Sequence, residues 1–129
     1  MLAVIDTNIL VSALWSKDGT PASVLSLVLN GKVTACVDNR IMTEYRAVLS
    51  RPKFGFSKNE VDALLDWVSH YSLSVVPEPV ADEFIDASYK KFYEVAKHCG
   101  AVLVTGNLKH YPADSQVVTA ATFLGMIPH

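Results

Sequence analysis

The sequence predicts an α/β protein, a three-layer α/β/α sandwich around a mainly parallel central sheet. Short runs that are apolar at every position alternate with segments whose apolar residues recur at helical spacing. Strands covered by helices on both faces have this continuous apolar character. The length of 129 residues and the 50% apolar content fit one domain spanning residues 1–129. In such sheets, functional residues gather where the strands end at their carboxyl termini.

The first third of the chain contains two of the expected strands and two helices. Leu2–Ile5 is apolar throughout and predicts a strand, and Ile9–Trp15 predicts a short helix after it. A second helix is expected over Pro21–Leu29, because proline suits the first helical turn and Asn30-Gly31 provides a stop. Val33–Val37 predicts the second strand.

The middle of the chain predicts two further helices and a third strand. Arg40–Leu49 is expected to be helical and to stop before the Arg51-Pro52 pair. Ser57–Glu60 has the pattern of a capping box, which marks the start of a helix. Apolar residues follow it at helical spacing: Val61, Leu64, Leu65 and Val68. The third strand is expected over Leu73–Val76.

The last third predicts a long helix and the fourth strand. The helix starts at Phe84 or Asp86 and ends at Cys99, with Gly100 as the residue that terminates it. Ala101–Val104 is again apolar throughout and predicts a strand. The remaining elements are a weak fifth strand over Gln116–Val118 and a last short helix capped by Thr119.

The charge balance argues against a protein that holds nucleic acid mainly through a large basic surface. The chain carries 11 Lys and Arg against 13 Asp and Glu, which gives a formal charge of −2. The same balance is compatible with an enzyme that meets a phosphate backbone through metal ions held by its own acids.

The sequence also predicts the compartment. The start of the chain has no basic region before its apolar run, and no apolar run approaches the roughly 20 residues that span a membrane. Cys36 and Cys99 form no CxxC pair, so we expect two reduced, unpaired thiols. These features predict a cytoplasmic protein without membrane contact.

Polar residues follow two of the expected strands. Asp6-Thr7-Asn8 comes after the first strand and Thr105-Gly106-Asn107 after the fourth, so parallel strands would bring them to one sheet edge. Each has a structural alternative, because Asp6 could cap a helix and Thr105-Gly106-Asn107 could form only a tight turn. Glu44 lies within an expected helix and could be a solvated glutamate.

Together with their surrounding residues, these polar motifs resemble the PIN-domain ribonucleases, within the branch of toxins from toxin–antitoxin systems. The resemblance runs in order over nearly the whole chain. It is carried by Val4–Leu14, Thr43–Tyr45, Val48–Phe54, Phe92–Ala96 and Val102–Pro112.

The resemblance implies a cluster of acids that holds Mg²⁺ or Mn²⁺ for hydrolysis of phosphodiester bonds in single-stranded RNA. It places Asp6 and Glu44 among the catalytic and metal-binding acids. Asn8 and Thr105 would be supporting polar residues, and Asn107 stands at a metal-binding position where many relatives have aspartate. The implied partners are RNA and an antitoxin protein, and surplus apolar surface in a small domain predicts a homodimer.

The sequence departs from the family pattern at the start of the penultimate helix. There the family pattern resembles Asp-x-x-Asp-[Lys/Arg]-x-Phe, and Tyr89 stands at its catalytic aspartate. A neutral phenol is a poor ligand for Mg²⁺. Asp86, one helical turn earlier, is the replacement candidate for a catalytic and metal-binding acid, with a helix cap or a solvated acid as alternatives. We therefore expect a weakened metal site that holds one ion loosely.

A few further side chains are candidates for contact with RNA. Lys90, Lys91, Lys109 and His110 could form a short basic rim at this edge, with a solvated face as the alternative for the lysines. The larger aromatic residues are expected in the core or at subunit contacts rather than as platforms for bases: Trp15, Trp67, Tyr45 and Tyr93.

Three functions are consistent with the sequence. The first is a metal-dependent endoribonuclease, the toxin of a toxin–antitoxin pair. The second is a catalytically weakened PIN-fold module that binds RNA or an antitoxin peptide, which Tyr89 and Asn107 favour. The third is a nucleotide-binding or receiver-like α/β protein, which the absence of GxGxxG and GxxxxGK[ST] motifs disfavours.

Overall fold

A computed structural model of the protein describes residues 1–128 and confirms the predicted fold class. All five strands are parallel and form one sheet in the order β3-β2-β1-β4-β5. In the register of this sheet, Ala3 of β1 pairs with Ala35 of β2 and with Val102 of β4. The strands are β1 (Leu2–Ile5), β2 (Thr34–Val37), β3 (Leu73–Ser74), β4 (Val102–Val104) and β5 (Val117–Val118).

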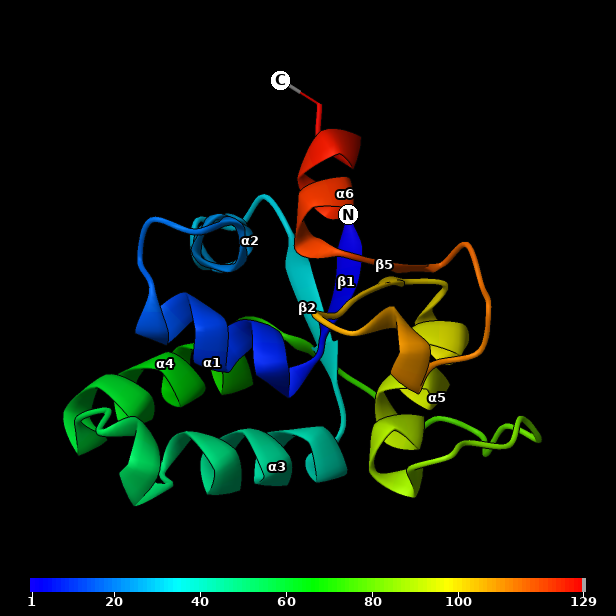
Figure 1. Ribbon diagram of the computed structural model, residues 1–129, viewed down its shortest axis with the longest axis horizontal. Coiled ribbons are helices and arrows are strands. Elements are labelled where there is room, and N and C mark those ends of the chain that lie inside the picture. The colour runs from blue at the N-terminus through cyan, green and yellow to red at the C-terminus, as the bar shows by residue number, and fades with distance from the viewer. Residues whose placement is uncertain (129) are drawn as a thin grey trace.

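Helices cover both faces of the sheet. In Figure 1, α1, α2 and α4 lie on one side of β1 and β2, α5 lies on the other, and α3 runs below the strands. The helices are α1 (Thr7–Trp15), α2 (Thr20–Leu29), α3 (Asn39–Leu49), α4 (Lys58–Tyr71), α5 (Lys90–Cys99) and α6 (Ala120–Met126). Three short 3-10 helices connect them: η1 (Pro52–Phe54), η2 (Ala87–Tyr89) and η3 (Leu108–His110).

The continuous apolar strands are buried, as the sequence predicts. Ala3, Val4, Leu103 and Val104 have no exposed surface, because helices cover both faces of β1 and β4. The inner face of α5 contributes buried Phe92, Val95 and Ala96 to the same core. Within residues 1–128, no helix is both long enough and apolar enough to cross a membrane.

Two local predictions about α5 have different outcomes. Gly100 ends the helix in the left-handed conformation, at φ 61°, as expected. The start of the helix differs from the prediction, because α5 begins at Lys90 rather than at Phe84 or Asp86. The Asp86 carboxylate accepts a hydrogen bond from the backbone N–H of Ser88 and so caps the separate turn η2.

Both cysteines are free, as the sequence predicts. Cys36 lies in β2 and is buried, and its pKa is raised to about 12 by burial and by the neighbouring thiol of Cys99. Cys36 is therefore a neutral thiol at physiological pH.

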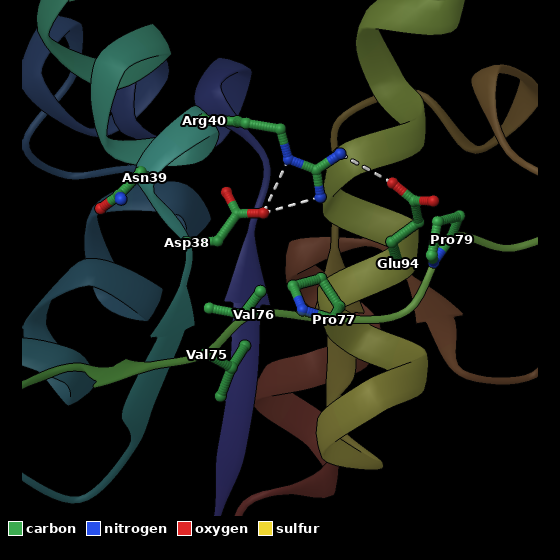
Figure 2. A pocket seen from close by; sticks show the side chains of 8 residues that line it. All are labelled: Asp38, Asn39, Arg40, Val75, Val76, Pro77, Pro79 and Glu94. Atoms are coloured by element: carbon green, nitrogen blue, oxygen red, sulfur yellow. Dashed lines mark hydrogen bonds and ion pairs between the residues drawn. The ribbon is translucent and has the colours of Figure 1, made fainter.

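An ion-pair network joins α3 to α5 one helical turn before Glu44 on α3 and pairs the half-exposed Arg40 with two buried carboxylates. The Arg40 guanidinium lies 2.7 Å from Asp38 Oδ2 and 2.8 Å from Glu94 Oε1 (Figure 2). Both carboxylates are almost fully buried and accept further hydrogen bonds from backbone N–H groups, Asp38 from Ile41 and Glu94 from Val80. The network therefore holds the start of α3, the body of α5 and the segment before α5 in one arrangement.

Replacement of Arg40 by methionine is expected to destabilise the protein by about 2 kcal/mol, because it leaves two buried carboxylates without a counter-charge. Chemical unfolding at pH 7 measures this loss. Arg46→Met is the matched control, since Arg46 pairs with Asp62 at the surface and its loss is expected to matter much less. Equal losses in the two variants would contradict the structural role of the network.

Candidate functional site

Asp6 is a buried carboxylate at the end of the central strand β1. Its side chain is 2% exposed and makes no cap hydrogen bond to α1, although Asp6 precedes that helix. Instead, its Oδ2 accepts hydrogen bonds of 2.8 Å from the hydroxyls of Thr105 and Tyr111. Burial raises the pKa of Asp6, the nearby Glu44 raises it further, and the two hydroxyls oppose the shift. The Asp6 side chain thus links the end of β1 to residues that follow β4 instead of capping α1.

Glu44 is brought beside Asp6 by the packing of α3 against β1. The hydroxyl of the buried Tyr45 donates a hydrogen bond to the carbonyl of Ile5, next to Asp6. Glu44 accepts a hydrogen bond from the Thr7 hydroxyl through Oε2. Its Oε1 lies 2.7 Å from the ammonium of Lys91 on α5. Both oxygens of Glu44 therefore have a partner within the protein.

Asp6 and Glu44 lie in the wall of an open cleft of about 430 Å³. Helices α1 and α3 form much of its lining, with Ser88 and Tyr89 of η2 contributing another part. Arg51 and Phe54 also line it. The cleft combines two acids, one cation and two aromatic rings, which is a mixed lining rather than an acidic one.

The loop after β4 is tied to the start of α1. The backbone N–H of Gly106 donates a 2.9 Å hydrogen bond to Asn8 Oδ1. A Cβ at position 106 would lie 3.2 Å from the same oxygen, so glycine allows this close approach. Thr105 is fully buried, donates to Asp6 and accepts from the backbone N–H of Asn107. Asn8 and Thr105 therefore tie the loop after β4 to the end of β1 and the start of α1.

Asn107 uses its side chain within its own loop. Its Oδ1 accepts from the backbone N–H of Lys109, and its Nδ2 lies 3.1 Å from Nε2 of His110. The His110 ring packs against Tyr89, with 4.0 Å between ring centroids. Among the described residues, the lining of the cleft does not include Asn107. Asn107 is thus a loop-capping residue in this arrangement.

Tyr89 lines the cleft where the family pattern has its aspartate. Burial raises the pKa of the Tyr89 phenol, and the carboxylates of Asp6, Asp86 and Glu44 raise it further. The phenol is therefore neutral at physiological pH and supplies no anionic ligand.

Asp86 and the two other candidate lysines lie apart from this centre. The Asp86 side chain is exposed and accepts from Ser88, which lowers its pKa, and it is not part of the described lining of the cleft. Lys90 is half-buried at the start of α5, and Lys109 is exposed in η3. The structure thus brings together Asp6, Asn8, Glu44 and Thr105, and leaves Asp86 and Lys109 at the surface.

Sequence reasoning placed Lys91 on a basic rim for RNA and missed its ion pair with Glu44, and it gave Tyr111 no role. Lys91 is only 14% exposed, and its ammonium also contacts the carbonyl of Ser88, so it is fixed beside Glu44 rather than solvated. Tyr111 and Thr7 supply hydroxyls to Asp6 and Glu44, respectively. No spacing rule predicts the contacts to Asp6 and Glu44, because each joins elements that are far apart in the sequence. Arg51 and Phe54 belong to a stretch that carries the family resemblance, but the sequence assigned neither residue a role.

A divalent cation, which the resemblance to the PIN-domain ribonucleases implies, does not fit the donor set of this cleft. Mg²⁺ and Mn²⁺ need several oxygen ligands, usually with more than one carboxylate free to bind. Here Glu44 is neutralised by Lys91, Asp6 Oδ2 already accepts two hydroxyls, and Tyr89 is neutral. Within residues 1–128, no group of three or more His, Cys, Asp or Glu side chains is arranged to hold a metal ion.

Comparison with known proteins gives the family. Residues 3–109 match the family model of the PIN domain, so the chain belongs to the PIN domain family. The chain is also similar to the uncharacterized protein MJ1680 of Methanocaldococcus jannaschii, with 28% identity over 107 residues. That match covers 81% of this chain and 69% of the relative.

A solved structure shares the fold. A chain of the crystal structure of VapBC2 from Rickettsia felis, bound to a DNA fragment from their promoter, superimposes with a TM-score of 0.58. The match covers 92% of this chain and 97% of that chain, at 18% sequence identity. This likeness supports the PIN-like fold class that the sequence predicts.

Lys91→Met is expected to raise the affinity of the cleft for Mn²⁺ about tenfold, because it removes the ammonium that neutralises Glu44. Isothermal titration measures the dissociation constant. Lys90→Met is the matched control, since the neighbouring Lys90 has no ion pair among the described residues. Tight binding of two ions by the unmodified protein, or no difference between the variants, would contradict the assignment of Lys91.

Asp6→Asn is expected to stabilise the protein at pH 7 by about 1 kcal/mol, as often occurs when a functional group is removed. The raised pKa means that the stability contributed by Asp6 is fully present below 3.8, its ordinary value, and is lost as the pH rises through the folded-state pKa. The advantage of the variant should therefore vanish towards acidic pH in thermal unfolding.

Asp86→Asn is the control, because the pKa of Asp86 is shifted in the opposite direction to that of Asp6. The pKa of the exposed Asp86 is lowered, so its stabilising contribution is present at neutral pH and is lost as the pH falls through the folded-state pKa. Asp86→Asn should therefore give no gain at pH 7. An Asp6→Asn protein that is less stable than the parent at pH 7 would contradict the burial cost assigned to Asp6.

Proposed function

We propose that this protein binds single-stranded RNA at the cleft of Asp6 and Glu44, as a catalytically weakened PIN module. The observation that carries the proposal is the Lys91–Glu44 ion pair, which places a protein cation where the family would need a metal ion. Tyr89 supports it, since a neutral phenol lines the cleft at the position of an acid in the family pattern.

The cations around the cleft favour a phosphate backbone as the ligand. Arg51 lines the cleft and has no ion pair among the described residues. A free guanidinium can bind a phosphate through two hydrogen bonds. Lys90, Lys109 and His110 are proposed as further contacts on the side of η2 and η3. Local cations of this kind permit RNA binding despite a net charge of −2.

The second candidate function is a Mg²⁺- or Mn²⁺-dependent endoribonuclease. It is favoured by the Asp6 and Glu44 carboxylates that line one cleft, where burial and then the charge of Glu44 raise the pKa of Asp6, and by membership of the PIN family. Asp6, Glu44, Asp86 and Asn107 would be its catalytic or metal-binding residues. In the described arrangement Asp86 and Asn107 serve as caps of η2 and η3, which is why this candidate stands second.

We further propose an antitoxin protein as a partner, on the basis of the likeness to a chain of VapBC2 from Rickettsia felis. Association of two copies is proposed as well, since large apolar side chains such as Val76 and Ile85 are exposed. The free thiols of Cys36 and Cys99 suit a reducing compartment, so a cytoplasmic location completes the proposal.

The decisive test combines binding and cleavage of a single-stranded RNA. The parent protein is expected to bind the RNA in both the presence and absence of Mn²⁺, and to cleave it no faster than Asp6→Asn does. Tyr89→Asp restores an acid to the lining of the cleft and is expected to increase Mn²⁺-dependent cleavage at least about tenfold. Product formation on a gel and binding by fluorescence anisotropy provide the measurements.

Tyr71→Asp is the matched control, because it makes the same substitution at an exposed tyrosine on α4. It should leave binding and cleavage at the level of the parent. Rapid Mn²⁺-dependent cleavage by the parent that Asp6→Asn abolishes would overturn the proposal in favour of the second candidate. Absence of RNA binding under all conditions would overturn both.

A further inference from the structure

A cluster of three aromatic side chains stands at the rim of the cleft. Trp15 ends α1, Phe54 ends η1 and Phe56 follows shortly after. The rings of Phe54 and Phe56 are stacked, with 5.6 Å between centroids and 13° between planes. Trp15 packs edge-on against both, at 5.9 and 6.2 Å. The three residues form one rigid aromatic surface, which we call the Trp15 platform.

The Trp15 platform is open to a ligand. Trp15 is 63% exposed, which is a large apolar area to leave in water. Phe54 and Phe56 are half-buried behind it and fix its orientation. Trp67, the second tryptophan of the chain, is by contrast half-buried and packs against Tyr71 on α4. Of the two locations that the sequence predicts for Trp15, the core and a subunit contact, the structure excludes the core.

Two cations accompany the platform. Lys53 Nζ lies 5.1 Å from the centroid of the Phe54 ring, and Arg51 lies two residues before Lys53. Both are exposed, and neither forms an ion pair within residues 1–128. The nearest acid along α4, Glu60, is already paired with Lys17. An aromatic surface with unpaired cations beside it has the charge and shape that suit a base and its phosphate.

The platform and the cleft share a wall. Arg51 and Phe54 belong both to this rim and to the lining that contains Asp6 and Glu44. Tyr89, on α5's side of the cleft, contributes a second aromatic ring to the same lining. A chain of nucleotides that passes along the cleft would meet Arg51 and then the Trp15 platform.

We propose that the Trp15 platform stacks an unpaired base of single-stranded RNA, while Arg51 and Lys53 hold the adjacent phosphates. The inference rests on the proposed function and adds the requirement for an unpaired base. Stacking on an aromatic side chain tolerates any base but needs its face to be free, so duplex RNA is a poor ligand. The occupant of this surface is RNA rather than a protein, because free cations flank it.

The test uses the intrinsic fluorescence of Trp15 in full-length Trp67→Phe protein, in which Trp15 is the sole tryptophan. A single-stranded oligouridine is expected to quench this fluorescence on binding. An abasic oligonucleotide of equal length and charge should bind more weakly and leave the fluorescence unchanged. Trp15→Ala is expected to weaken oligouridine binding about tenfold in anisotropy titrations, whereas Trp15→Phe retains most of the affinity.

The outcomes separate this inference from the proposed function. If no variant and no parent protein binds RNA, the proposed function fails and the platform assignment falls with it. If the parent binds RNA and Trp15→Ala binds equally well, only the platform assignment is overturned. If Trp15→Ala leaves RNA binding intact but converts a dimer to a monomer in light scattering, the surface is a protein interface and the inference is again overturned. Trp67→Phe alone should leave RNA affinity unchanged.

Discussion

The ion pair between Lys91 and Glu44 is the interaction that decides whether the cleft can bind a divalent cation. It crosses from α5 to α3 and is held from both sides, since Thr7 engages the other oxygen of Glu44 and Ser88 engages the Lys91 ammonium. Ions that are largely removed from water are retained when they are paired and hydrogen-bonded. A divalent cation would have to compete with a counter-charge that is covalently part of the protein.

Asp6 is held by the same packing of helices and strands, but its carboxylate has no cationic partner among the described residues to offset the cost of burial. Its carboxylate is buried at the end of β1, and hydroxyls from Thr105 and Tyr111 offset only part of the cost of burial. The network of Asp38, Arg40 and Glu94 holds α3 and α5 in place beside it. The PIN fold thus keeps its buried acid while the surroundings replace acids by Tyr89 and Asn107. This combination is the basis of the proposed function as a weakened PIN module that binds RNA.

The features that depend on a local sequence pattern could be predicted from the sequence. Strands that are apolar throughout, the glycine after α5 and the polar residues at the ends of β1 and β4 follow from rules of burial and turn geometry. The site could be predicted only in part. Asp6 and Thr105 meet because parallel strands end together, which a sequence pattern can indicate.

Contacts between distant side chains could not be predicted. Lys91 resembles any helical lysine in sequence, and only the crossing of α3 and α5 reveals that it meets Glu44. Asp86 and Asn107 could each bind a ligand or cap a turn, and the choice depends on backbone geometry that residue type does not determine. Trp15 was expected in the core or at a subunit contact because large aromatic residues are usually buried, whereas its partners Phe54 and Phe56 leave it at the surface of the chain.

The most direct test of the central claim is a crystal of the protein soaked in Mn²⁺ and measured at the manganese absorption edge. If Lys91 holds the position beside Glu44, the anomalous map should show no manganese between Asp6 and Glu44, and the Lys91 ammonium should remain on Glu44. An ordered manganese ion bound by Asp6 and Glu44, with Lys91 displaced, would contradict the claim and identify a metal-dependent nuclease site.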